Sequence, residues 1–142
     1  MAIPRIRACA ICVHGSELLT IALRDPVSGQ VFRSVPGGEV ETGESAAAAA
    51  SRETLEETGY RVVADAGSER ISRYDFVWAG ETYDCQTSWF ICELTSTEAI
   101  PVLDEDYVLE AAWIPLNVLE SRLVEHQHIR EVILDMVSPY RT

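Results

Sequence analysis

The chain has 142 residues, a length that fits a single domain over residues 1–142. Hydrophobic residues make up 47% of it, which excludes wholesale disorder, and 23 acidic against 11 basic residues give a net charge of −12. This charge repels long polyanions, so we do not expect nucleic acid as a partner, whereas a small anionic substrate can bind when a divalent cation lies between its phosphates and the protein's carboxylates.

The first 44 residues predict strands and turns. Two apolar runs predict a hairpin or adjacent strands, and a segment rich in Pro, Ser and Gly predicts a loop. A further short strand leads into Pro36-Gly37-Gly38. In chain order these segments are Arg5–Val13, Leu18–Leu23, Asp25–Gln30 and Val31–Val35.

One helix stands out in the rest of the chain. Ser45–Thr58 contains strong helix formers, and Gly59 stands just beyond its end, where a left-handed residue closes many helices. Alternating or β-branched segments predict further strands, and helical apolar spacing predicts two late helices. The strands are Tyr60–Ala64, Glu69–Trp78, Thr82–Leu94 and Ala111–Ile114, the loop between the last two is Thr95–Asp106, and the late helices are Leu116–Leu123 and His128–Met136. This order predicts an α/β fold, a mixed sheet with helices on both faces.

The cysteines are Cys9, Cys12, Cys85 and Cys92. The N-terminal segment lacks the pattern of a signal peptide, and no stretch approaches the roughly 20 apolar residues of a membrane span. We therefore expect a cytoplasmic protein with free thiols and no membrane association. Cys9 and Cys12 form a CxxC pattern, but residues three apart in a strand point to opposite faces, which favours buried hydrophobes over a zinc or redox site.

The predicted helix gathers carboxylates. Glu53, Glu56 and Glu57 share one face with three alanines, while the opposite face carries Ala47, Ala48, Ser51, Thr54, Leu55 and Thr58, small enough to pack closely on a sheet. Like charges at this spacing repel by a few tenths of a kcal/mol per pair, roughly. Either an arginine or a hard cation can relieve this repulsion, and Arg52 is adjacent. Ligands that are all oxygen suit Mg²⁺ or Mn²⁺. The alternative is a solvated acidic face.

A glycine-rich segment precedes this helix. Gly37, Gly38 and Gly43 let the backbone approach a ligand, and the N–H groups that begin the helix favour anions. The combined pattern, Gly38-x₅-Glu44-x₇-Arg52-Glu53-Thr54-Leu55-Glu56-Glu57-Thr58-Gly59-Tyr60, resembles the signature of the Nudix hydrolase family, MutT-like proteins included. The rest of the chain is similar more loosely, through its strand order and Trp113–Leu116. Thr54 and Tyr60 stand where aliphatic residues are usual, at positions that concern packing.

The resemblance implies a Nudix-type α/β/α sandwich and hydrolysis of a nucleoside diphosphate linked to another moiety, such as a nucleoside triphosphate or a nucleotide sugar. It implies a Mg²⁺ or Mn²⁺ site made of Glu53, Glu56, Glu57 and the Gly37 carbonyl. It also implies that Arg52 orients Glu53 and that Glu44 pairs with Arg52 or supports water, although a purely structural Glu44–Arg52 salt bridge is an equal alternative. Homodimers are common in the family.

Other roles stay open. The general base is Glu53 or Glu57 on the helix, or an acid of the late acidic segment, where Glu110 is preferred to Glu105. The candidates for substrate contact are Gly38, Arg24 and Arg33, with surface charge as the alternative for both arginines. The aromatic residues Tyr74, Phe76, Trp78 and Trp89 stack a base or fill the core, and the core role is favoured for any one of them.

Three functions compete on these grounds. The first is the metal-dependent hydrolase, acting on a small-molecule nucleotide. The second is a non-catalytic Nudix-type module that binds a nucleotide and regulates a partner. Degenerate modules usually lose signature glutamates, and this sequence keeps them. The third, a structural domain with an acidic face, leaves the glycines unexplained.

Overall fold

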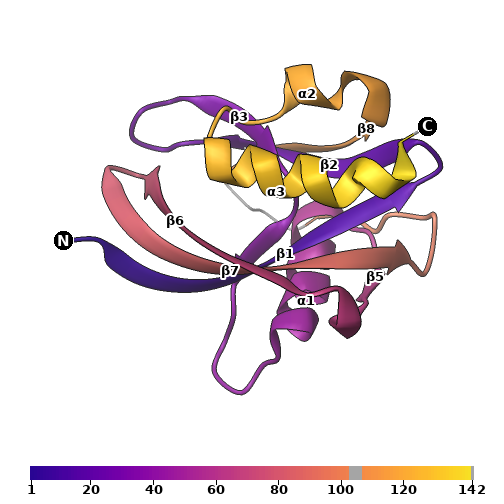
Figure 1. The fold of residues 1–142 in the computed structure, drawn as a ribbon, viewed down its shortest axis with the longest axis horizontal. Coiled ribbons are helices and arrows are strands. Elements are labelled where there is room, and N and C mark those ends of the chain that lie inside the picture. The colour runs from indigo at the N-terminus through magenta and orange to yellow at the C-terminus, as the bar shows by residue number, and fades with distance from the viewer. Residues whose placement is uncertain (103–106, 142) are drawn as a thin grey trace.

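The computed structural model describes residues 1–102 and 107–141 of the chain. A mixed eight-stranded sheet lies at its centre, with α1 against one face and α3 against the other (Figure 1). This arrangement confirms the expected α/β/α sandwich. The strands are β1 (Ile3–His14), β2 (Glu17–Arg24), β3 (Val31–Ser34), β4 (Gly37–Glu39), β5 (Val62–Ala64), β6 (Arg70–Trp78), β7 (Glu81–Leu94) and β8 (Val108–Pro115), and the helices are α1 (Ala46–Thr58), α2 (Leu119–Arg122) and α3 (Gln127–Val137).

The register of β1 makes room for a pocket. β1 runs parallel to β7 over Ile3–Cys12, but in the described residues it pairs with β2 only at Val13–Leu18 and His14–Glu17. Earlier along β1, β4 lies beside it instead, at Arg7, Ala8 and Cys9. Since β1 and β2 diverge from their hairpin, the two parts of the sheet separate, and side chains from both parts face the space between them.

The side chains of β1 alternate between two cores. Cys9 and Ile11 belong to the cluster that α3 covers, and Cys12 belongs to the cluster beneath α1, with Ala49 and Ala50. The four cysteines, Cys9, Cys12, Cys85 and Cys92, are buried and free. The interpretation of the CxxC pattern as buried small side chains is therefore confirmed, because the strand sends its two thiols to opposite faces.

Both ends of α1 are capped, and the closure at Gly59 is the one predicted from the sequence. The Ser45 hydroxyl oxygen accepts a hydrogen bond from the Ala48 N–H at 3.1 Å. Gly59 adopts φ +79°, and its N–H donates to the Leu55 carbonyl at 2.9 Å. Inside the helix, Thr54 fills the place of an aliphatic residue by donating its hydroxyl to the Ala50 carbonyl.

The prediction of which helix face meets the sheet was right for Thr54 and Thr58 and wrong for the rest of that face. The buried positions of α1 are Ala49, Ala50, Glu53, Thr54, Glu57 and Thr58, whereas Ala48 is exposed and Leu55 is half-buried. Two glutamates therefore lie on the packed side of the helix. The helix can bury these two glutamates because β4 lies opposite them. The glycines of β4 leave room for the carboxylates, which larger side chains would fill, and a backbone N–H of β4 donates a hydrogen bond to one of them.

Other boundaries also differ from the predictions. Gly37 and Gly38 form part of the short strand β4, because pairing with β1 imposes an extended backbone that glycine alone does not favour. Strand β8 is longer than predicted, and the helix expected at Leu116–Leu123 is a 3₁₀ turn, Leu116–Val118, followed by the single turn α2. None of the helices in the described ranges is long and apolar enough to cross a membrane.

We predict that Gly59→Ala lowers the free energy of unfolding by about 2 kcal/mol, because the residue has positive φ and a Cβ there would lie 2.1 Å from the Ile100 carbonyl oxygen. Urea unfolding measures the change. Gly29→Ala is the matched control, because it shares the positive φ and has open space around the new methyl group. Equal losses in the two variants would contradict the steric part of this prediction.

Candidate active site

The glutamates of α1 pack directly against the glycines of β4. Glu57 is 2% exposed, and its Oε1 accepts a hydrogen bond from the Gly37 N–H at 2.8 Å. Glu53 is 9% exposed, and its carboxyl carbon lies 2.4 Å from the position that a Cβ on Gly38 would occupy. Any larger residue at position 38 would displace this carboxylate, so the glycine sets where Glu53 lies.

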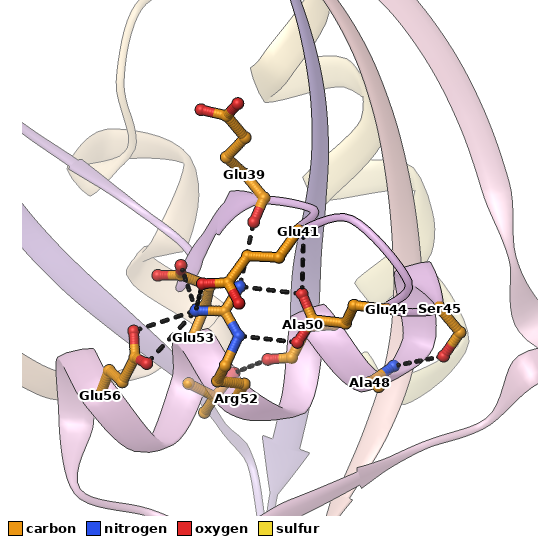
Figure 2. A network of polar contacts seen from close by, with 10 residues as sticks. Glu39, Glu41, Glu44, Ser45, Ala48, Ala50, Arg52, Glu53 and Glu56 are labelled. Atoms are coloured by element: carbon orange, nitrogen blue, oxygen red, sulfur yellow. Dashed lines mark hydrogen bonds and ion pairs between the residues drawn. The ribbon is translucent and has the colours of Figure 1, made fainter.

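Arg52 is the centre of a network of carboxylates (Figure 2). Its guanidinium donates to both oxygens of Glu44, at 2.7 and 3.0 Å, and to Glu53 at 2.9 Å. It also reaches Glu56 at 3.2 Å and donates to the Glu39 carbonyl at 3.0 Å. The expected contacts of Arg52 with Glu44 and Glu53 are therefore present, and a bidentate pair of this kind fixes orientation as well as charge.

The network carries more negative than positive charge. Arg52 faces the carboxylates of Glu44, Glu53 and Glu56, with Glu41 at 3.6 Å. The hydrogen bond from Arg52 lowers the pKa of Glu44 below its usual value of 4.5, with help from the Glu41 N–H, so Glu44 is ionised at neutral pH. One cation therefore balances only part of the charge that these acids hold together.

The donors suit a hard divalent cation. One Arg52 nitrogen, Nη1, lies 2.9 Å from Glu53 and 3.2 Å from Glu56, so these two carboxylates already converge on a positive group. Glu57 is buried beside them on the Gly37 amide. Within the described residues no three such side chains form a preformed metal cluster. Oxygen donors of this type select Mg²⁺ or Mn²⁺ over zinc.

A pocket of about 470 Å³ opens beside these carboxylates, between the two separated parts of the sheet. Glu53, Glu57, Gly37 and Gly38 form one wall. The remaining walls combine aliphatic and polar side chains with the aromatic residues Phe32, Tyr74, Phe76, Trp78, Tyr83, Trp89 and Tyr107. A pocket with carboxylates at one end and aromatic rings along its walls offers places for a cation-bound phosphate and for a planar ring.

The aromatic candidates from the sequence all line this pocket. Phe76 stacks near Trp78 with ring centroids 6.5 Å apart, and Phe32 meets both rings edge-on, at 5.8 and 5.9 Å. Trp89 and Tyr74 are almost fully buried and belong also to the core under α3. Core packing and contact with a ligand are therefore compatible here, because the same sheet face builds the core and the pocket wall.

Three other sequence candidates lie elsewhere. Arg24 is exposed and is absent from the pocket lining. Arg33 stands between the lining residues Phe32 and Ser34, and strand alternation turns it away, where it bonds the Thr20 hydroxyl at 2.9 Å and Glu110 at 2.5 Å. The structure thus brings Arg33 and Glu110 together but does not place them on the pocket wall. Glu105 lies outside the described residues.

The sequence reasoning missed two arginines of the pocket. Arg5 and Arg7 line it from β1. The Arg5 guanidinium lies over the Tyr83 ring, 4.0 Å from its centroid, and 3.8 Å from Glu39. Both arginines occur in a strand that is mostly apolar, well ahead of the Gly-rich segment. Their alternation with Cys9 was the available signal, since it places all three side chains on one face.

Comparisons with known proteins agree with this geometry. A family model described as NUDIX domain matches residues 4–136. A protein named "Putative mutator protein MutT4", from Mycobacterium tuberculosis (strain CDC 1551 / Oshkosh), is 34% identical over 112 residues, which are 77% of this chain and 44% of that protein. The chain thus spans less than half the length of that relative.

Solved structures share the fold. A NUDIX hydrolase from Nitrosomonas europaea superposes with a TM-score of 0.70 at 25% identity, covering 97% of this chain and 91% of the other. A MutT protein from Methanosarcina mazei Go1 superposes with the same TM-score at 17% identity, covering 99% and 98%. At the lower identity the likeness concerns the fold alone.

We predict that Gly38→Ala weakens Mn²⁺ binding about tenfold while the chain stays folded, because the new methyl group meets the movable end of Glu53. Electron paramagnetic resonance titration of free Mn²⁺ gives the affinity, and circular dichroism reports the fold. Gly67→Ala, whose Cβ would meet only Asp65 Oδ1 at 3.3 Å, is the control. Unchanged Mn²⁺ affinity in Gly38→Ala would show that the position of Glu53 does not matter for metal.

We also predict that Glu44 contributes stability that acid removes. Its folded-state pKa is lowered, so the contribution is full above the unfolded pKa, near 4.5, and disappears as the pH falls through the lower folded value. Glu44→Gln should therefore be less stable than wild type at pH 7, and the gap should close toward pH 3. Urea unfolding at several pH values tests this, with Glu81→Gln, an exposed carboxylate at the β6–β7 turn, as control. A gap that is independent of pH would contradict it.

Proposed function

The chain belongs to the Nudix hydrolase family, and we propose that it hydrolyses a phosphoanhydride bond in a nucleoside diphosphate linked to another moiety, such as a nucleoside triphosphate or a nucleotide sugar, with Mg²⁺ or Mn²⁺ as cofactor. One observation supports this above all. Glu53 and Glu57 line the same pocket as the closely approaching backbone of Gly37 and Gly38, with aromatic rings along the other walls.

The carboxylate end of the pocket is the proposed place of the diphosphate. Glu53, Glu56, Glu57 and the Gly37 carbonyl supply hard oxygen donors for the cation. When bound, the cation neutralises charge on the phosphate oxygens and lowers the pKa of the attacking water. The lack of side chains at Gly37 and Gly38 leaves room for a phosphate to approach the backbone.

Each residue of the network has a distinct task in this proposal. Arg52 holds Glu53 through its charge-assisted bond and is itself held by both oxygens of Glu44. The Gly37 N–H donates to one oxygen of Glu57. Because this bond fixes the carboxylate group, it also fixes the direction of the second oxygen. Glu44 and Arg52 are thus positioning residues, and Glu53 and Glu57 are those that face the substrate.

The general base is best sought on α1. Glu53 and Glu57 line the pocket, whereas Glu110 pairs with Arg33 and is not part of the described lining. A base must come within hydrogen-bond reach of the water that it deprotonates, directly or through one further water. This geometric requirement favours the helix glutamates over Glu110.

The aromatic end of the pocket is the proposed place of the nucleoside. Phe32, Phe76 and Trp78 surround one region of the wall with ring contacts of 5.8 to 6.5 Å, and a nucleobase can stack on such surfaces. Stacking tolerates every base, so this feature supports a nucleotide substrate without choosing among bases.

We predict that Glu57→Gln lowers kcat/KM by at least about 100-fold on nucleoside triphosphates and nucleotide sugars, because the amide cannot serve as an anionic ligand or base. The fold should persist, since the glutamine oxygen still accepts the Gly37 N–H. Product chromatography with MgCl₂ measures turnover, as phosphate or pyrophosphate from triphosphates and as nucleoside monophosphate with sugar phosphate from nucleotide sugars. Glu69→Gln, exposed before β6, is the control.

We further expect wild-type turnover to vanish in excess EDTA and to return with Mg²⁺ or Mn²⁺. Full turnover in EDTA would exclude the proposed mechanism. Nucleotide binding without any turnover under all these conditions would favour the non-catalytic regulatory module instead.

A further inference from the structure

Arg7 lies at the carboxylate end of the pocket. It stands on β1, level with Glu39 of β4 on one side and Thr87 of β7 on the other. Gly38 and Gly37 are level with the next two residues of β1, Ala8 and Cys9. Its side chain lines the pocket together with the wall formed by Glu53 and Glu57.

The Arg7 guanidinium has no hydrogen bond or ion pair within residues 1–102 and 107–141, unlike the other arginines of this region. Arg5 pairs with Glu39, Arg33 with Glu110, and Arg52 with several carboxylates. Glu57 acts on Arg7 electrostatically, but one of its oxygens accepts the Gly37 N–H. A half-buried guanidinium without a fixed partner lowers the stability of the fold unless a ligand supplies acceptors for its N–H groups.

Glu57 of α1 is a carboxylate that acts on Arg7, whereas Cys9 and Tyr74 of the sheet carry no charge that could balance it. Burial raises the pKa of the Cys9 thiol to about 11 and that of the Tyr74 phenol to about 12, so both are neutral at pH 7. Arginine stays protonated in proteins. The positive charge of Arg7 therefore remains available to a group that enters the pocket.

We propose that Arg7 is a substrate-binding residue whose guanidinium binds phosphate oxygens of the nucleotide. This inference rests on the proposed function and deepens it. The guanidinium presents paired N–H donors that match two phosphate oxygens, and it reaches the pocket from β1, whereas the proposed metal-binding carboxylates reach it from α1. The diphosphate thus lies between a cation held by α1 and the fixed cation of β1.

Register separates Arg7 from the aromatic end and so favours phosphate over the nucleobase. Arg7 is level with Thr87 on β7, whereas Phe76 is level with Tyr83 and Trp78 with Glu81. These positions are four and six residues away along β7, which is about 13 and 20 Å at the rise of a strand. The glycines of β4, by contrast, are one and two residues away.

The test compares Arg7→Gln with Arg7→Lys and Arg73→Gln. Arg73 is exposed on the same sheet, one residue from the lining residue Tyr74, so its variant makes the same charge change away from the pocket. Steady-state kinetics with ATP, GTP, CTP and UTP should show KM raised about 10- to 100-fold for all four in Arg7→Gln. kcat should change much less, Arg7→Lys should recover part of the loss, and Arg73→Gln should match wild type.

Two kinetic outcomes would overturn the assignment. An unchanged KM in Arg7→Gln would show that Arg7 does not bind substrate. A loss confined to one base would assign Arg7 to the nucleobase instead of the phosphate. Equal thermal midpoints of the variants show that folding is intact, and if Arg7→Gln fails to fold, the comparison of Arg7→Lys with wild type decides between the same outcomes.

A binding measurement separates this inference from the proposed function. Inorganic pyrophosphate should quench the fluorescence of the pocket tryptophans, with about tenfold weaker binding in Arg7→Gln and unchanged binding in Arg73→Gln. If wild type cleaves no nucleotide but this difference persists, the hydrolase proposal fails and the role of Arg7 stands. If wild type cleaves nucleotides but the variants bind pyrophosphate equally well, the hydrolase proposal stands and the role of Arg7 fails.

Discussion

The buried hydrogen bond from the Gly37 N–H to Glu57 determines how α1 meets the sheet. It is possible only because β4 presents bare backbone: a Cβ at Gly37 would lie 2.4 Å from Cys9 Sγ and 2.7 Å from the Ala8 carbonyl oxygen. The same close approach at Gly38 places Glu53. A carboxylate that is 2% exposed needs such a donor, since an unpaired buried charge is expensive. The pocket wall therefore depends on two glycines as much as on two acids.

Arg52 reduces the repulsion among the acidic side chains of α1. Without it, Glu53 and Glu56 would repel each other at a helical spacing of three residues. Because Arg52 also binds the Glu39 carbonyl and Glu44, it ties the helix to the segment that leads into it. The residual negative charge is the property that a divalent cation would use, so one network serves both the folding of this region and its proposed chemistry.

Local signals predicted much of this molecule, and long-range register decided the rest. Gly59 marks the end of α1 through an interaction within a few residues, so the sequence reveals it. The pairing of Arg33 with Glu110, 77 residues apart, depends on β2 pairing with both β3 and β8, which no local pattern encodes. Arg7 was missed for the same reason: its importance comes from β4 and β7 lying beside it, not from its neighbours in the chain.

The divergence of β1 from β2 has an evolutionary consequence. The acids occupy α1, while the aromatic wall is drawn from β6 and β7, which belong with β1, and from β3, which pairs with β2 across that split. Exchanges such as a smaller ring at Phe32 or Phe76 would reshape the space for a nucleoside and leave the spacing of the glutamates intact. In such a scaffold, substitutions on β3, β6 and β7 can change substrate preference. The glutamates of α1, which carry the proposed chemistry, can meanwhile stay the same.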